Sequence, residues 1–213
     1  MEIDFWAQRW KEGRIGFHEG RTNTFLARHA RHLGPPPRRV LVPLCGKTED
    51  MAFLAAEGHD VVGIEAIEDA VKAFFREHDL EPSVRELDRG VRAYSSERVT
   101  LLAGNVFDCT REHVGAVDAL YDRAALVALP ADTRTRYVAH LRGLLAPGSK
   151  VLLVTFDYDQ SKVNGPPFAV DEPEVRRHYA GGRVTLLDQG PLDGPKFREA
   201  GIRGTEQCFS IEL

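Results

Sequence analysis

Beyond residue 38, short apolar runs alternate with stretches in which apolar side chains recur at helical spacing. The apolar runs predict buried β-strands over residues 40–42, 60–65, 99–103, 117–121 and 150–156. The amphipathic stretches predict helices over residues 48–57, 67–78 and 132–145. This alternation is typical of successive βα units, so we expect an α/β fold with a mostly parallel sheet and helices on both of its faces.

Boundary signals and weaker patterns complete this outline. Thr48 is a good N-cap residue, and Gly58 stops the helix that follows it. Residues 82–97 are polar and weakly patterned, which predicts a loop or a β-ribbon. Near the C-terminus, apolar runs over residues 184–187 and 207–211 predict two antiparallel strands added at the sheet edge.

Residues 34–37, a glycine followed by three prolines, separate the first part of the chain from this body, because neither a helix nor a central strand can cross them. Upstream, aromatic side chains recur at roughly helical spacing as far as Trp10, and a second amphipathic segment begins after Asn23, a good N-cap. We therefore expect one domain over residues 1–213, in which residues 1–35 form an appendage of two short helices.

Composition narrows the possible partners. The chain has 213 residues with 43% hydrophobic side chains, and its 28 basic and 32 acidic side chains give a net charge of −4. Such a chain has no overall positive field to hold a nucleic acid or an anionic membrane. Its three cysteines, Cys45, Cys109 and Cys208, are widely spaced and predict neither a disulfide framework nor a metal site.

Targeting signals are not apparent either. The first residues lack the apolar stretch of roughly 7–15 residues that a signal peptide needs. No apolar run approaches the roughly 20 residues that cross a bilayer. We therefore expect a cytoplasmic protein.

The turn after the first predicted strand, residues 43–48, is where an α/β sheet of this kind binds ligands. It contains one glycine, Gly46, so it lacks the dinucleotide pattern of three glycines. The tripeptide from Gly46 resembles the end of a phosphate-binding P-loop, but that motif needs a glycine at position 41, which is Leu41. We therefore expect no pyrophosphate or nucleotide triphosphate at this turn.

Glu65 ends the second predicted strand, 19 positions after Gly46. A carboxylate at about this spacing is typical of ribose recognition. Ribose recognition without phosphate recognition points to a nucleoside cofactor, and S-adenosylmethionine fits because it has no phosphate. The alternative is that Glu65 is only a solvated strand end.

Five short strings of the sequence occur in the order of a known family. They are residues 15–18 (IGFH), 40–47 (VLVPLCGK), 121–126 (YDRAAL), 155–158 (TFDY) and 165–168 (GPPF). In these strings the chain resembles the thiopurine S-methyltransferase family over nearly its whole length. The resemblance implies a single-domain, Rossmann-like class I methyltransferase fold, with antiparallel C-terminal strands and with residues 1–35 as an N-terminal helical lid.

The resemblance also implies where the cofactor is held. It assigns cofactor contacts to Trp10, Leu44, Glu65 and Arg123, with Gly46 approaching the cofactor in the first turn. At the adenine end it implies Asn105 and Val106, although the family usually has an aspartate where this chain has Asn105. An amide at this position can still present its carbonyl oxygen to the adenine amino group.

Arg123 is the expected catalytic residue, because its permanent charge can favour an anionic sulfur without moving a proton. An ion pair with Asp122 is the structural alternative. The resemblance places Phe17, His18, Pro166, Pro167 and Phe168 around the acceptor. His18 is the nearest candidate for a proton-transfer residue. The alternative is a histidine that is only solvated or packed. The family's second arginine, near the C-terminus, corresponds to either Lys196 or Arg198.

These expectations define a leading hypothesis. It is an S-adenosylmethionine-dependent S-methyltransferase that acts on a small aromatic or heterocyclic thiol and releases S-adenosylhomocysteine. The alternatives are methylation of sulfide, thiocyanate, halide or oxyanions of selenium and tellurium, or a cofactor-binding protein without catalysis. Cys45 lacks an activating partner in the sequence, so we expect it to pack rather than to act as a nucleophile. We expect a monomer without a metal, a nucleic acid or a membrane partner.

Overall fold

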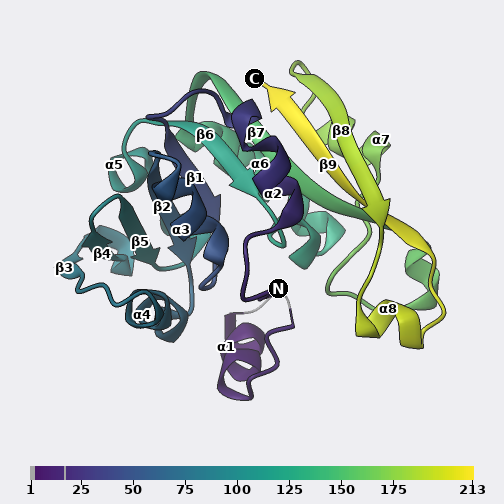
Figure 1. Cartoon of the computed structure of the whole chain (residues 1–213), viewed down its shortest axis with the longest axis horizontal. Helices are drawn as coiled ribbons and strands as arrows, with labels where there is room; N and C mark the ends of the chain where they lie inside the picture. The colour runs from purple at the N-terminus through teal and green to yellow at the C-terminus, as the bar shows by residue number, and fades with distance from the viewer. Residues whose placement is uncertain (1–2, 17) are drawn as a thin grey trace.

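A nine-stranded sheet forms the centre of the molecule (Figure 1). The computed structural model describes residues 3–16 and 18–213. The strands lie in the order β3-β4-β5-β2-β1-β6-β7-β9-β8, and β5, β2, β1, β6 and β7 are parallel. The strands are β1 Arg39–Pro43, β2 Asp60–Glu65, β3 Ser83–Glu86, β4 Arg92–Ser96, β5 Val99–Ala103, β6 Val117–Asp122, β7 Leu145–Tyr158, β8 Arg183–Pro191 and β9 Gly204–Glu212.

Helices cover both faces of the sheet. The α-helices are α1 Ile3–Lys11, α2 Thr24–His29, α3 Glu49–Ala56, α4 Glu68–Glu77, α5 Arg111–Val114, α6 Ala131–Leu144, α7 Glu172–His178 and α8 Pro195–Glu199. Helices α2, α3 and α4 share one apolar cluster with the sheet, whereas α5, α6 and α7 share another. Short 3-10 segments lie at residues 30–33, 88–90, 106–108, 126–128 and 160–162.

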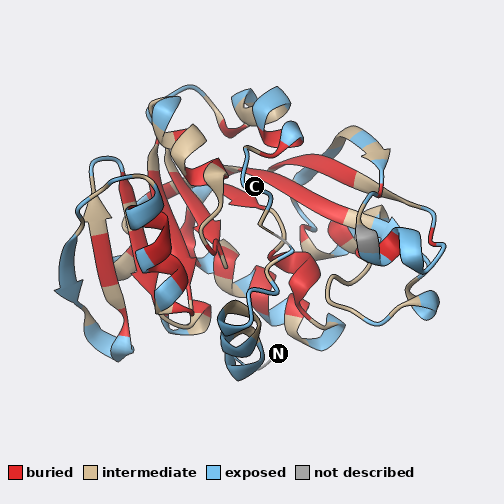
Figure 2. Ribbon diagram, turned by 60° about the horizontal axis from the view of Figure 1, so that its bottom comes forward, coloured by how far each residue is buried: buried red, intermediate tan, exposed pale blue. Residues whose placement is uncertain are grey.

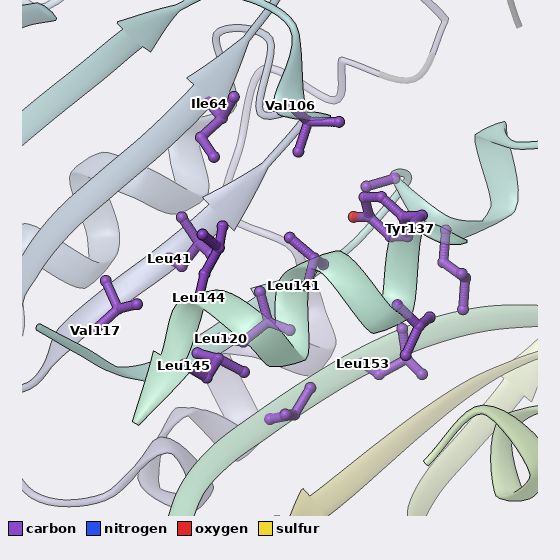
Figure 3. Close-up of a cluster of buried hydrophobic side chains, with 14 of the residues drawn as sticks. Leu41, Ile64, Val106, Val117, Leu120, Tyr137, Leu141, Leu144, Leu145 and Leu153 are labelled. Atoms are coloured by element: carbon purple, nitrogen blue, oxygen red, sulfur yellow. The ribbon is translucent and has the colours of Figure 1, made fainter. Parts of the chain in front are cut away.

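The larger core lies between α6 and the central strands (Figure 3). Leu141 and Leu144 of α6 point toward Leu41 and Leu120 of the sheet, and all four are at most 5% exposed. Each such leucine contributes roughly 1.5–3 kcal/mol on burial. Figure 2 shows the same burial along the central strands, whereas the outer strand β3 is exposed.

The sequence prediction of the sheet is confirmed, with informative differences. The polar stretch 82–97 forms the antiparallel ribbon of β3 and β4. Strand β7 begins at Leu145, earlier than expected, because an irregularity against β6 accommodates the residues before Lys150. The two C-terminal strands are antiparallel additions, and β9 lies between β7 and β8. The short helices α5, α7 and α8 were not predicted.

Buried polar bonds join the N-terminal segment to the sheet. Asn23 caps α2, as predicted, by accepting the backbone N–H groups of Phe25 and Leu26. The Asn23 backbone N–H donates to Oδ1 of Asp50 at 2.7 Å, and the Tyr121 hydroxyl donates to Oδ2 of Asp50 at 2.9 Å. Asp50 is 1% exposed and lies in the first turn of α3. One carboxylate thus ties three elements together.

Asp50 offers a direct test of this junction. Asp50→Ala leaves two buried donors without an acceptor, so we expect the free energy of unfolding to fall by about 3 kcal/mol. Tyr121→Phe removes one donor and leaves the other bond intact, so a loss of roughly 1–2 kcal/mol is expected. Urea unfolding of both variants measures the difference. Equal losses would contradict the shared role of Asp50.

Candidate functional site

A cavity of about 570 Å³ opens at the carboxyl ends of the parallel strands. Strand β1 has β2 on one side and β6 on the other, so the connections after β1 and β6 diverge there. Residues that follow five strands line the cavity, together with residues of α1. The strand-end residues are Leu44 to Thr48, Glu65, Ala66, Asn105, Val106, Arg123, Ala124 and Phe156.

The turn after β1 approaches β2 closely. Leu44 and Gly46 have positive φ angles of 47° and 54°, and the Cys45 N–H donates to the Ile64 carbonyl at 3.0 Å. Glycine adopts a positive φ angle at no steric cost. In this turn the glycine, Gly46, stands where the backbone meets Glu65. The Gly46 N–H donates to Oε2 of Glu65 at 2.8 Å. Gly46 and Glu65, which lie 19 positions apart in the sequence, are therefore in contact.

Glu65 is a buried carboxylate on the cavity wall, not a solvated strand end. Its Oε1 accepts the Ile67 N–H at 2.8 Å, and its Oε2 accepts the bond from Gly46. Burial raises the pKa of Glu65, and these backbone bonds oppose the shift. A carboxylate has about four acceptor positions, so acceptor capacity is left for two hydroxyl groups. The site therefore fits a ribose and, with one glycine in the turn, a cofactor without phosphate.

Asn105 lies on the cavity wall but its oxygen has a local partner. Its Oδ1 accepts the Phe107 N–H at 3.0 Å and so caps the short 3-10 segment after β5. Val106 is buried beside it and also lines the cavity. The guanidinium of Arg136 lies 3.9 Å from the centre of the Phe107 ring, and both residues line the cavity. Sequence reasoning missed Phe107 and Arg136.

Arg123 follows β6 and lies in the cavity, with its side chain 11% exposed. It forms an ion pair with Glu19, which belongs to the segment between α1 and α2. Asp122, the expected alternative partner, instead accepts the Leu126 N–H at 3.0 Å and the Tyr137 hydroxyl at 2.8 Å. Burial raises the pKa of Asp122 to about 6. The buried Asp122 thus fixes the backbone from which Arg123 extends.

The expected acceptor residues are only partly assembled. His18, Pro166 and Pro167 line the cavity, and burial lowers the pKa of His18. Phe17 lies outside the described residues. Phe168 is not among the cavity-lining residues, since its ring packs against Gly165 and its N–H donates to the Val127 carbonyl at 2.6 Å.

The C-terminal part of the chain also contributes residues to the cavity. The sequence analysis left some of these open and did not indicate others. Lys196 lines the cavity and donates to the Pro166 carbonyl at 2.8 Å, whereas Arg198 is exposed and pairs with Asp193. Phe156, Phe197 and Glu206 also line the cavity. Phe156 and Glu206 stand at corresponding register positions of β7 and β9. The alternation of side chains along β9 could have assigned Glu206 to one face of the sheet. It could not have shown which face of the sheet borders a cavity.

Helix α1 borders the cavity without entering a core. None of its residues is buried, and Ile3, Trp6, Arg9 and Trp10 line the cavity from one helical face. Figure 1 shows α1 apart from the layers around the sheet, and Figure 2 shows it without any buried residue. The expected contact of Trp10 with the cofactor site is therefore geometrically possible, because the cavity also contains Glu65.

The cysteines give no sign of nucleophilic chemistry. All three are buried, and desolvation raises the pKa of each thiol. The sulfur of Cys45 packs against Gly63. A Cβ atom added to Gly63 would lie only 2.8 Å from this sulfur. Among the described residues, no group of histidine, cysteine and carboxylate side chains is arranged to hold a metal ion. No helix of the described chain is long and apolar enough to span a membrane.

Comparison with solved structures defines the class of the fold. The chain superimposes on an S-adenosylmethionine-dependent methyltransferase from Anabaena variabilis with a TM-score of 0.68, 12% identity, and coverage of 100% of this chain and 95% of that one. A magnesium protoporphyrin IX methyltransferase from Synechocystis, with bound S-adenosylhomocysteine, gives 0.66 at 14% identity, covering 98% and 96%. The fold is that of the class I methyltransferases.

Sequence comparison then identifies the family. The family model described as Thiopurine S-methyltransferase matches residues 1–211. A thiopurine S-methyltransferase of Pseudomonas aeruginosa is 48% identical over 99% of this chain and 98% of its own length. One from Bordetella petrii is 44% identical over 95% and 94%. The chain belongs to the thiopurine S-methyltransferase family, so it is an S-adenosylmethionine-dependent methyltransferase, and the resemblance in its motifs is confirmed.

Proposed function

We propose that the acceptor is the sulfur of a small aromatic or heterocyclic thiol, bound in the cavity beside Arg123. The observation that carries this proposal is a nearly buried guanidinium in a cavity whose lining residues include Phe156, Phe197 and Pro167. Flat apolar surfaces suit a planar ring, and a fixed positive charge suits a sulfur that is anionic or becomes so. The relatives named above carry thiopurine in their names, which supports the same class of acceptor.

The cofactor fits the opposite wall of the same cavity. In our proposal Glu65 accepts hydrogen bonds from the ribose, Gly46 and Leu44 border the methionine part, and Asn105 and Val106 border the adenine. When bound, S-adenosylmethionine supplies a methyl group on a positively charged sulfur. The 570 Å³ cavity lies within the range of roughly 300–1,000 Å³ that is usual for small-molecule sites.

Positioning explains most of the catalysis that we propose. Arg123 holds the acceptor sulfur, and the ring side chains exclude water around it. The acceptor sulfur carries no proton and is itself the nucleophile, so the reaction needs no covalent intermediate with the enzyme. His18 lies in the cavity with a lowered pKa, which favours a neutral imidazole that contacts the ring of the acceptor.

We further propose that residues 1–35 act as a lid. Helix α1 meets the rest of the chain at the cavity, and the Glu19–Arg123 ion pair ties the following segment to the catalytic residue. In our proposal the enzyme is monomeric and acts on a small molecule without a macromolecular partner. Three buried free thiols suit a reducing compartment such as the cytoplasm.

An acceptor panel tests the proposed reaction. We expect the enzyme to methylate thiophenol and 2-mercaptopyrimidine in preference to sulfide, thiocyanate, iodide, selenite and tellurite, as measured by formation of S-adenosylhomocysteine. Arg123→Lys keeps the charge but loses the planar fork, so kcat/KM for the thiols should fall about tenfold or more, which corresponds to at least about 1.4 kcal/mol. The melting temperature should stay nearly unchanged. A preference for the inorganic acceptors would overturn the proposal.

The role of Glu65 is tested by binding. Glu65→Ala removes the proposed ribose contact, so calorimetry should show at least about a tenfold weaker affinity for S-adenosylhomocysteine. Asp69→Ala is the matched control, because Asp69 is exposed in the first turn of α4 and does not line the cavity. Circular dichroism of both variants checks the fold. Undiminished affinity in a folded Glu65→Ala protein would show that Glu65 only supports the two turns.

The lid is tested by limited proteolysis. Trypsin should cut after Lys11 and Arg14 more slowly when S-adenosylhomocysteine is bound, because the ligand adds contacts to the α1 face at the cavity. Cleavage after Arg89, in the exposed turn between β3 and β4, should not change. Peptide mass analysis over time gives both rates. Identical rates at Lys11 with and without ligand would contradict a lid.

A further inference from the structure

Glu206 adds a carboxylate to the part of the cavity that contains Arg123. It lies in β9, and its register partners are Phe156 of β7 and Gly190 of β8. Glu206 and Phe156 both line the cavity. Within the part of the chain that the structure describes, no side chain or backbone group donates a hydrogen bond to the Glu206 carboxylate. The carboxylate oxygens of Glu206 are therefore available to accept hydrogen bonds from a ligand or from water.

The charges around Glu206 come from two other segments. Arg123, after β6, lowers the pKa of Glu206, whereas burial and the carboxylate of Glu19 raise it, and the net shift is upward. The register partners on β7 and β8 carry no charge. Cys208, two positions along β9, stays a thiol because desolvation and nearby carboxylates raise its pKa to about 12. Glu206 is thus a carboxylate with a raised pKa near a guanidinium whose ion pair is with Glu19.

The chemistry of heterocyclic thiols gives such a carboxylate a task. In these compounds the proton resides largely on a ring nitrogen next to the carbon–sulfur bond, so the neutral molecule is a thione with a ring N–H. Methylation at sulfur leaves a cation unless that N–H proton departs. Proton transfer to a positioned carboxylate typically contributes 10²–10⁴-fold to such a step, and it works best when the carboxylate pKa is raised.

We propose that Glu206 accepts the ring N–H of a heterocyclic thione and takes its proton while the sulfur is methylated. This proposal rests on the proposed thiol-methylating function and makes it more specific. The π electron pair of the C=S bond forms the new bond from sulfur to the methyl carbon, which leaves a C–S single bond. The bond from methyl to the cofactor sulfur breaks, with its electron pair going to that sulfur. The N–H electron pair becomes part of a ring C=N bond, and the proton goes to Glu206.

The proposal separates two kinds of acceptor. A thiophenol carries no ring N–H and reacts as its thiolate, so it needs Arg123 but not Glu206. A heterocyclic thione such as 2-mercaptopyrimidine needs both residues at a pH below the pKa of its N–H. Above that pH the acceptor has already lost the proton, and Glu206 has no proton to take.

Glu206→Gln tests this directly, because the amide keeps the shape and a hydrogen-bond acceptor but is not a base. Near neutral pH we expect kcat for 2-mercaptopyrimidine to fall by about 100-fold or more. Calorimetric affinity of the same acceptor for the S-adenosylhomocysteine complex should change by less than about threefold, since the amide oxygen still accepts the N–H. Activity toward thiophenol should stay within about twofold, and the defect with 2-mercaptopyrimidine should shrink as the pH rises through the N–H pKa of the acceptor.

Controls separate this idea from its alternatives. Glu199→Gln removes an exposed carboxylate of α8 that does not line the cavity, and it should behave as the wild-type protein. Equal losses with both thiols in Glu206→Gln, or no loss with either, would overturn the proton-accepting role. A wild-type protein that methylates neither thiol would instead reject the proposed function itself. A wild-type protein active on both, with a defect confined to the thione, supports Glu206.

Discussion

The bonds from Gly46 and Ile67 to Glu65 are the constraint on which the site depends. At the carboxyl ends of β1 and β2 the chain leaves the sheet, so backbone N–H groups lose their partners in neighbouring strands. One buried carboxylate accepts an N–H from each of the two departing connections, at 2.8 Å in both cases. The positions of the two turns are thereby fixed relative to each other, which preforms one wall of the cavity.

Buried carboxylates also accept hydrogen bonds at the end of β6 and in the first turn of α3. Asp122 accepts a backbone N–H and the Tyr137 hydroxyl below Arg123, and Asp50 joins α3, β6 and the N-terminal segment. Each is at most 1% exposed. A buried carboxylate costs free energy unless hydrogen bonds satisfy it, so these acids are stable only when their surrounding turns are formed. The walls of the cavity therefore keep their shape only while the surrounding fold is intact.

The sequence predicted the parallel sheet well because periodicity reports which residues are buried. Strand β2 and strand β5 were predicted with their observed bounds, and the caps at Asn23 and Thr48 are as expected. Helices α5, α7 and α8 have 4, 7 and 5 residues, which is too short for a helical period to emerge. Strand β7 extends earlier than predicted because its register against β6 absorbs a proline and a glycine, which a local pattern does not reveal.

Prediction of the site shows a different limit. Glu65 and Arg123 follow strands that could be recognised, so their convergence could be predicted from topology. Glu19, Phe156 and Glu206 come from segments far apart in the sequence, and their presence in one cavity depends on how the N-terminal segment and β9 pack on the sheet. Phe168 is not among the described residues that line the cavity, and its ring lies against Gly165. A motif names the segment that borders a site but not which of its side chains faces it.

Asn105 illustrates why a departure from a family pattern needs its local structure. Its amide stands where the family usually has an aspartate. In the structure its Oδ1 caps the 3-10 segment by accepting the Phe107 N–H, and an aspartate oxygen accepts the same bond equally well. The exchange therefore keeps the backbone that carries Val106 and Phe107 along the cavity. It removes one negative charge from a wall where Arg136 lies over Phe107, so the change affects local charge and leaves the architecture of a methyltransferase intact.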